Sequence, residues 1–310
     1  MSRIHDALKK AEEQKLASFG SSPVPDAVES SVEEFPEIAL EVVVQGEGSI
    51  EALGPQLAPP PTSKPVVADE PPLLVDARQT VWSPTKDALF LTAADSHSPG
   101  LEEFRTLRAK LFQTRAKRPL KTLLISSALP AEGKSFVSAN LAQAFARQRG
   151  GRTLLIDGDL RKPRLHELLG APSSPGLFEY LAGKASESEI IQRSSSDDLF
   201  FIPGGRVNSN AAELIGNGRV QSLLDRLSPM FNWIVIDSSP VVPVSDPTRL
   251  AGLCDGVLLV VKSGSTPHLI AERAKREFHD ATLLGVVFNR VPREQNQYYK
   301  YSYGEYGSTK

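Results

Sequence analysis

Short apolar runs alternate with helical stretches along the chain from residue 122 onward. The runs are 122–126, 153–157, 199–203, 233–237, 256–261 and 285–289. They show no alternation with polar residues, which is typical of parallel strands buried on both faces of a sheet. Between them, the apolar spacing at 135–148, 219–227 and 271–281 is that of amphipathic helices. The pattern predicts one doubly wound α/β domain with a mostly parallel sheet, whose ligand crevices lie at the carboxyl ends of the strands.

A helix is also predicted at residues 101–112, ahead of the first strand. Its apolar side chains fall on one stripe, formed by Leu101, Phe104, Leu107 or Arg108, and Leu111. A second amphipathic helix is predicted at residues 1–17, where the apolar stripe is too narrow to fold alone. We therefore expect the helix at residues 1–17 to dock on a partner outside the domain. The alternative is a frayed terminus without a function.

Residues 20–80 have a different composition from the rest of the chain. They contain ten prolines and carry eleven acidic against two basic residues, so they lack the apolar density that offsets chain ordering. We expect four regions: an amphipathic helix at 1–19, a disordered acidic and Pro-rich linker at 20–84, a globular domain at 85–292, and a tail at 293–310.

The overall composition narrows the class of protein. The formal charge of −2 over 310 residues gives no general attraction to nucleic acid or membranes. The single cysteine, Cys254, excludes an internal disulfide and lies in an apolar stretch, where a small buried side chain is favoured over a nucleophile. No apolar run approaches the ~18 residues that span a bilayer. We expect a soluble chain in the cytoplasm.

A phosphate-binding loop follows the first strand. The segment ALPAEGKS at residues 128–135 matches the P-loop pattern, with alanine at its first glycine position. Backbone N–H groups and the start of the next helix would cradle phosphates, Lys134 would reach the β and γ phosphates, and Ser135 would ligate Mg²⁺. The alternative is a turn with an exposed lysine. The candidate nucleotide contacts here are Pro130, Ala131, Glu132, Gly133, Lys134, Ser135 and Phe136.

Three aspartates end buried strands of the same sheet. Asp157 and Asp159 follow the second strand, and Asp237 ends the strand at 233–237. A single aspartate there is commonly a helix cap. Three of them at the edge that receives the P-loop predict a metal and phosphate site. Mg²⁺ prefers oxygen ligands, so Ser135, one or two aspartates and the nucleotide are enough to bind it.

These segments together resemble the bacterial tyrosine kinases that direct capsule and exopolysaccharide production. The motifs are SSALPAEGKS, LLIDGDLRKPRLH, GLFEYLAG and IVIDSSPVVPVSD. Partition and septum-placement ATPases carry a signature lysine early in the loop, where this chain has Leu129. In "RVNSNAAELI" the family shows a proline-rich helix entry, whereas this chain has Ala211 and Ala212. The resemblance covers residues 85–310 and implies a P-loop kinase domain with ATP and Mg²⁺ as cofactors.

The resemblance also implies roles for individual residues. Lys134 neutralises the transferring charge, while Ser135, Asp237 and Asp159 hold Mg²⁺. Asp157 accepts the tyrosine proton, although Asp159 could exchange roles with it. Two further residues have open interpretations. Arg161 contacts phosphate or forms a salt bridge, and Asn289 recognises adenine or caps a turn.

The chain ends in a cluster of tyrosines. Five of its six tyrosines lie in the last 13 residues: Tyr298, Tyr299, Tyr301, Tyr303 and Tyr306. The resemblance implies a flexible self-substrate that a neighbouring subunit phosphorylates in trans. The alternatives are a sticky low-complexity end or a stacking surface for single-stranded nucleic acid, and Lys300 alone is a poor electrostatic match for the latter.

The same family closes a ring of subunits through an ExxRxxR helix. Glu102, Arg105 and Arg108 have that spacing, and an ordinary surface ion pair is the alternative. As further partners, the resemblance implies a membrane-anchored polysaccharide co-polymerase or activator protein and a tyrosine phosphatase, with no nucleic acid. We expect the helix at residues 1–17 to recruit the chain to the inner face of the membrane through that activator.

Two other functions remain as hypotheses from the sequence. One is a positioning ATPase of the partition type, against which Leu129 and the tyrosine tail argue. The other is a noncatalytic scaffold whose nucleotide state controls a polysaccharide export complex. The favoured hypothesis is an ATP-dependent protein-tyrosine autokinase that regulates polysaccharide synthesis and export.

Overall fold

The structure is a computed structural model that describes residues 71–84, 99–148, 150–194, 198–206 and 211–291, and the backbone of 39–44. The expected N-terminal helix and the tail tyrosines lie outside these residues. Within the described residues, no helix is both long enough and apolar enough to cross a membrane.

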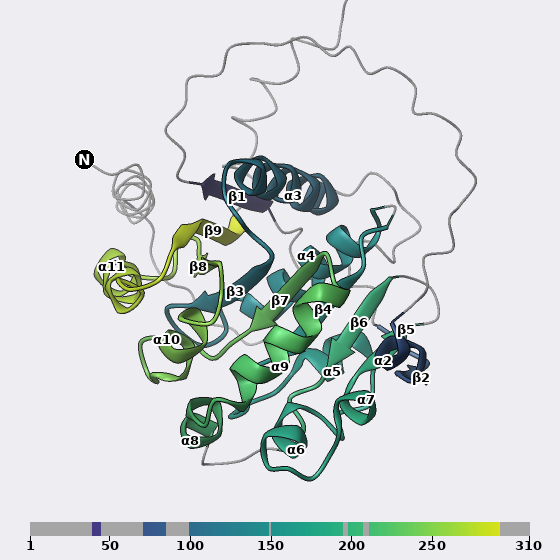
Figure 1. Ribbon diagram of the computed structural model, residues 1–310. Coiled ribbons are helices and arrows are strands. Elements are labelled where there is room, and N and C mark those ends of the chain that lie inside the picture. Colours follow the sequence, from purple (N-terminus) through teal and green to yellow (C-terminus); the bar gives the residue numbers. More distant parts are fainter. Residues whose placement is uncertain are drawn as a thin grey trace, which may run out of the picture.

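The described residues form one nine-stranded sheet in the order β1-β9-β8-β3-β7-β4-β6-β5-β2 (Figure 1). The strands are β1 (Ala39–Val44), β2 (Arg78–Thr80), β3 (Thr122–Ser127), β4 (Thr153–Asp157), β5 (Gln192–Ser194), β6 (Leu199–Ile202), β7 (Trp233–Asp237), β8 (Gly256–Lys262) and β9 (Leu283–Val291). Neighbours pair in parallel, except β1 with β9 and β5 with β6. The prediction of a mostly parallel sheet is confirmed.

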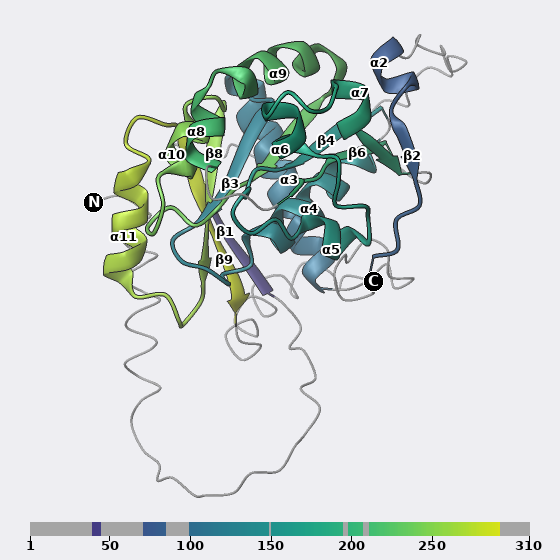
Figure 2. The same cartoon turned by 90° about the horizontal axis from the view of Figure 1, so that it is seen from below.

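Helices cover both faces of the sheet (Figures 1 and 2). One face is covered by α3 (Pro99–Lys117), α4 (Lys134–Ala146) and α5 (Leu165–Leu169). The other is covered by α6 (Leu177–Leu181), α7 (Glu187–Ile190), α8 (Ala211–Gly216), α9 (Arg219–Leu227), α10 (Asp246–Ala251) and α11 (His268–Glu277). This arrangement has the two helical layers of a doubly wound fold.

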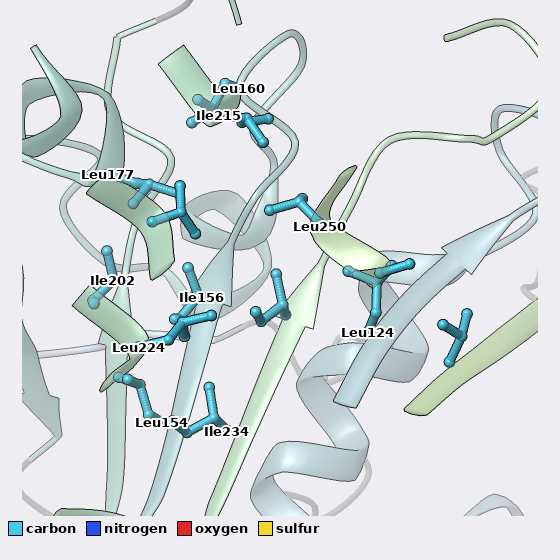
Figure 3. Packing of buried hydrophobic residues seen from close by; sticks show 14 of the residues in the cluster. Leu124, Leu154, Ile156, Leu160, Leu177, Ile202, Ile215, Leu224, Ile234 and Leu250 are labelled. Carbon is cyan, nitrogen blue, oxygen red and sulfur yellow. The ribbon is translucent and has the colours of Figure 1, made fainter. Parts of the chain in front are cut away.

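Strand β3 shows why the apolar runs have no polar alternation. Leu123 and Ile125 join the core layer under α3 and α4, whereas Leu124 joins the layer on the opposite face. Leu124 packs there with residues such as Ile234 and Leu250 (Figure 3). Successive side chains of a strand point to opposite faces, so a strand buried on both faces needs apolar residues at every position.

The predicted stripe of the first helix in the domain is confirmed in α3. Leu101, Phe104, Leu107 and Leu111 are all buried, none of them more than 4% exposed. Their spacing places them on one face of the helix, which packs against α4. Arg108, the alternative member of the stripe, is only half-buried.

The expected linker of residues 20–84 requires a correction. Residues 39–44 pair with β9, and α2 (Pro72–Val75) and β2 extend the opposite edge of the sheet. Leu74 is fully buried, and the Trp82 ring packs edge-on against Phe201 with a 6.0 Å centroid separation. The mean composition over residues 20–80 concealed the short apolar stretch at 71–84. Its strand β2 pairs with β5 at the edge of the sheet. Residues 39–44 and 71–84, which fall within the predicted linker, therefore contribute to the sheet of the globular domain.

Trp233 anchors the end of β7 that lies away from the P-loop. Its ring stacks on Phe145 of α4 with centroids 4.2 Å apart, and the Arg115 guanidinium lies 4.8 Å above it. We expect Trp233→Ala to lower the free energy of unfolding by about 3–5 kcal/mol, since it removes a buried aromatic side chain. Leu269→Ala, at a position that is 74% exposed, should change it by less than about 0.5 kcal/mol. Urea unfolding followed by circular dichroism tests both, and equal effects would contradict the packing described.

Candidate active site

The P-loop joins β3 to α4 at the carboxyl edge of the sheet. Gly133 has φ of +93°, and a Cβ atom there would lie 1.9 Å from the Asn289 amide nitrogen, so only glycine fits. Ala131 is also left-handed, with φ of +64°. Pro130 and Ala131 are exposed, and the loop ends at the N-terminus of the 13-residue helix α4. This is the strand–loop–helix setting that presents backbone N–H groups to phosphates.

Lys134 lies at the centre of a buried cluster of charges. Its Nζ atom is 3.0 Å from Asp159 Oδ2 and 3.7 Å from Asp237 Oδ2. Burial alone would lower the pKa of the Lys134 ammonium group, but the carboxylates of Asp237 and Asp159 outweigh burial and raise the pKa above its ordinary value. The lysine thus keeps its positive charge at the mouth of the loop, where it can meet phosphate oxygens.

Asp237 joins the end of β7 to the P-loop helix. Its Oδ2 atom accepts a hydrogen bond from Ser135 Oγ at 2.5 Å, and its Oδ1 atom accepts one from Ser138 Oγ at 3.1 Å. Burial raises the pKa of the Asp237 carboxyl, an effect opposed by Lys134 and the two hydroxyls. Ser135 Oγ and Asp237 Oδ2 therefore form a pair of hard oxygen atoms of the kind that Mg²⁺ prefers.

Asp157 combines the two alternatives that the sequence left open. It is fully buried, and in the β4–β7 register it lies opposite Asp237. Its Oδ2 atom accepts hydrogen bonds from the backbone N–H groups of Arg164 and Leu165, both at 3.0 Å, so it caps α5. Burial, and then the nearby Asp237 charge, raise the pKa of Asp157 well above its ordinary value. The residue is both a helix cap and a member of the carboxylate cluster.

Asp159 is the third carboxylate of the cluster. It is 4% exposed, and its Oδ1 atom accepts a hydrogen bond from the Lys162 N–H group at 3.2 Å. Its other oxygen contacts Lys134. In the described part of the chain, no group of three or more His, Cys, Asp or Glu side chains is arranged to hold a metal ion. A magnesium ion bound by Ser135 and Asp237 would complete its ligand shell with water and phosphate oxygens.

Three further predicted site residues, Arg161, Phe136 and Asn289, contact neighbouring segments of the protein. Arg161 forms the salt bridge that the sequence left as an alternative, with its Nε atom 2.5 Å from Asp246 Oδ2 at the start of α10. Phe136 lies against Phe104 of α3, with ring centroids 6.1 Å apart. Asn289 donates its amide to the Glu132 carbonyl oxygen at 2.9 Å, and its Oδ1 atom accepts from the Arg290 N–H group. Asn289 thus lies beside the P-loop, and adenine recognition stays a prediction.

The three candidate interface residues lie on α3. Glu102 and Arg105 are exposed and form an ion pair with each other. Arg108 is half-buried and donates a hydrogen bond to the Ala144 carbonyl oxygen of α4 at 2.7 Å. The surface ion pair considered as the alternative is therefore present, and a role between subunits stays a prediction.

Cys254 does not belong to the site. Its thiol donates to the Leu250 carbonyl oxygen at 3.2 Å, and burial raises the pKa of the thiol above its ordinary value. A thiol that stays protonated is a poor nucleophile. The expectation of a structural cysteine is consistent with this environment.

Three residues of the site were not predicted from the sequence. Ser138 follows Ser135 by one helical turn, so its position on the same face of α4 was a usable signal. Asp246, the partner of Arg161, and Thr266, whose hydroxyl bonds the P-loop residue Glu132, had no local signal. Both contacts join segments more than 80 residues apart in the chain.

Comparison with known proteins identifies the family. Residues 131–303 match the model of the CobQ/CobB/MinD/ParA nucleotide binding domain. The putative tyrosine-protein kinase CapB of Staphylococcus aureus is 33% identical over 206 residues, covering 66% of this chain and 90% of CapB. The chain belongs to the bacterial tyrosine kinase family. The tyrosine-protein kinase YwqD of Bacillus subtilis is 34% identical over 209 residues, which are 67% of this chain and 86% of YwqD.

Solved structures agree with this family. The chimerical protein CapA2B2 superposes with a TM-score of 0.62 at 30% identity, covering 67% of this chain and 92% of that one. The kinase domain of the Escherichia coli tyrosine kinase ETK gives 0.60 at 28% identity, covering 64% and 78%. The family model that matches is broad, so the kinase assignment rests on these relatives. The predictions of a tyrosine kinase and of a P-loop fold are confirmed.

The charge on Asp157 should make stability depend on pH. Because its pKa is raised in the folded state, the folded chain holds the proton to higher pH than the unfolded chain does. The free energy of unfolding should therefore fall as the pH rises from near 3.8 through the raised pKa. Asp157→Asn, whose amide cannot ionise, should flatten this decline.

Thermal unfolding of the nucleotide-free chain between pH 5 and 8 measures the effect. Asp225→Asn is the control, since Asp225 is exposed on α9. Parallel pH profiles for the wild-type and Asp157→Asn chains would show that Asp157 has no such role.

Proposed function

We propose that the chain is an ATP-dependent autokinase that phosphorylates the tyrosine cluster of a neighbouring subunit. The observation that carries this proposal is the convergence of Lys134, Ser135, Asp159 and Asp237 at the P-loop. Family membership supports tyrosine as the acceptor. Tyr298, Tyr299, Tyr301, Tyr303 and Tyr306 supply five candidate hydroxyls in the last 13 residues.

The contacts at the P-loop support a division of roles. Loop N–H groups and the start of α4 bind the phosphates of ATP, and Lys134 neutralises charge on the transferred group. Ser135 and Asp237, whose oxygens already lie together, would hold Mg²⁺. When bound, the metal supplies positive charge that stabilises the triphosphate during transfer. Asp159 keeps the Lys134 side chain directed to this point.

A carboxylate must accept the proton of the acceptor, because a tyrosine hydroxyl has a pKa near about 10 and is barely ionised at neutral pH. Burial raises the pKa of the Asp157 carboxyl, and a carboxylate with a raised pKa accepts a proton more readily. However, Asp157 has no exposed surface, and both of its oxygens accept backbone N–H groups. Asp159 is 4% exposed, so it lies nearer to solvent than Asp157, and it is the alternative acceptor of the tyrosine proton.

The biological setting is also part of the proposal. The succinoglycan biosynthesis transport protein ExoP of Rhizobium meliloti is 35% identical over 208 residues, which are 65% of this chain and 26% of ExoP. Together with the relatives named as tyrosine-protein kinases, this supports a role in regulating polysaccharide synthesis or export. We further propose a cytoplasmic ring built through Glu102, Arg105 and Arg108, a membrane-anchored activator bound by residues 1–17, and a phosphatase that resets the tail.

Incubation with γ-labelled ATP and Mg²⁺ should label tyrosine in the wild-type chain. Lys134→Met should lower labelling by about 100-fold or more, because it removes transition-state charge stabilisation. Ser135→Ala and Ser138→Ala form a matched pair, since both hydroxyls bond Asp237 but only Ser135 belongs to the P-loop. We expect Ser135→Ala to need far more Mg²⁺ for half-maximal labelling and Ser138→Ala to need little more. Release of free phosphate without labelled tyrosine would favour a positioning ATPase, and neither product would favour a scaffold.

A mixing experiment tests transfer between subunits. One chain carries Lys134→Met with an intact tail, and the other has an active site but phenylalanine at all five tail tyrosines. Each chain alone should stay unlabelled, whereas the mixture should label the Lys134→Met chain. Adding Glu102→Ala and Arg105→Ala to both chains should reduce that label severalfold if α3 joins the subunits. A mixture without label would mean that the tail is not phosphorylated in trans.

A further inference from the structure

Glu132 is a charged P-loop residue whose side chain is turned into the protein. It is only 2% exposed, whereas Ala131 beside it is exposed. Its Oε2 atom accepts a hydrogen bond from the Leu129 N–H group at 2.7 Å. This bond closes the loop on itself across three residues. A negative charge in a loop that binds phosphates is unfavourable by itself, so this side chain needs a structural reason.

The second carboxylate oxygen of Glu132 supplies that reason. Oε1 accepts a hydrogen bond from the hydroxyl of Thr266, which lies 134 residues away in the chain. Thr266 belongs to the turn between β8 and α11, where the N–H groups of Ser265 and Thr266 donate to the Lys262 carbonyl oxygen. The carboxylate therefore connects the P-loop to a hydrogen-bonded turn at the same edge of the sheet.

A third bond holds the same residue from its backbone. The Asn289 amide donates to the Glu132 carbonyl oxygen, and the Asn289 carbonyl oxygen accepts from the Ser263 N–H group at 2.8 Å. The P-loop is thus fixed to both β9 and the β8–α11 turn.

The loop needs such anchors because its backbone is strained. Ala131 has a left-handed conformation that a side chain makes unfavourable, by roughly 1 kcal/mol or more. Strained residues of this kind persist only where the surrounding contacts hold them. Without these hydrogen bonds, the loop N–H groups would sample other directions. Phosphate binding would then be weaker, because it would have to order the loop at an entropic cost.

We propose that Glu132 and Thr266 form a positioning pair, which holds the P-loop in its phosphate-binding shape from the β8–α11 turn. The Glu132 side chain contacts the protein rather than the nucleotide, so its part is separate from that of Lys134 and Ser135. The inference rests on the proposed nucleotide binding, and it adds the β8–α11 turn to the parts of the fold that set nucleotide affinity.

Matched substitutions at both positions test the pair. Thr266→Val removes the hydroxyl at nearly constant shape, and Thr266→Ser keeps it. Glu132→Ala removes both acceptors, whereas Glu132→Gln keeps an acceptor for Leu129 and a polar partner for Thr266. The readout is the dissociation constant of N-methylanthraniloyl-ADP with Mg²⁺, measured by fluorescence on the full chain, together with kcat and the KM for ATP.

Thr266→Val should weaken nucleotide binding by about tenfold, the usual effect of one lost buried hydrogen bond, and Glu132→Ala, which removes two such bonds, should weaken it by at least as much. Thr266→Ser and Glu132→Gln should stay within about threefold of wild type, because each keeps a polar partner for the hydrogen bond. KM for ATP should rise in the first two variants while kcat at saturating ATP stays near wild type. The double variant Glu132→Ala/Thr266→Val should bind no more weakly than Glu132→Ala alone.

Several outcomes would overturn the inference. Equal nucleotide affinity in Thr266→Val and Thr266→Ser would show that the Thr266 hydroxyl does not position the P-loop. Lowered unfolding temperatures with unchanged nucleotide affinity would show that the contacts only stabilise the fold. Nucleotide binding by the wild type without tyrosine labelling would refute the autokinase proposal and leave this inference standing. A wild-type chain that bound no nucleotide would refute both.

Discussion

Lys134 is a cation that lies within reach of three carboxyl groups at the P-loop. Asp157, Asp159 and Asp237 would repel one another at neutral pH, and burial would strengthen that repulsion by removing water. The lysine offsets this through contacts with Asp159 and Asp237, and backbone N–H groups offset it at Asp157. Repulsion among the carboxylates therefore destabilises the cluster, and a bound Mg²⁺ would reduce this repulsion. Such a loss of folding stability is common at functional sites, where the arrangement of charges serves catalysis.

The sheet register fixes which groups meet in this cluster. Asp157 and Asp237 are paired across β4 and β7, and β3 pairs Ile125 with Asp237 before it leads into the P-loop. A shift of one residue in either strand would turn one carboxyl group to the other face. The apolar side chains that bury both faces of β3, β4 and β7 oppose such a shift. The core therefore does more than stabilise the fold, because it sets the distances within the site.

Local patterns were enough to predict much of this architecture. The signal of six of the nine strands (β3, β4 and β6 to β9) lies within a few neighbouring residues, and so does that of the α3 stripe, the P-loop and the three aspartates. The partners of Arg161 and Glu132 could not be predicted in the same way, because Asp246 and Thr266 come from segments that only the tertiary fold brings close. The segment at 71–84 was missed for another reason. Its few apolar residues are outweighed by the acidic and Pro-rich sequence before them, yet β2 pairs with β5 and Trp82 packs on Phe201 of β6.

The pairing of β1 with β9 places two distant points of the chain together. Ala39 lies opposite Val291, so the N-terminal end of β1 and the C-terminal end of β9 lie side by side at one edge of the sheet. A force on the N-terminal end of β1 would therefore act directly on the C-terminal end of β9. Mechanical coupling between these two strand ends needs no path through the core, because one ladder of backbone hydrogen bonds joins them.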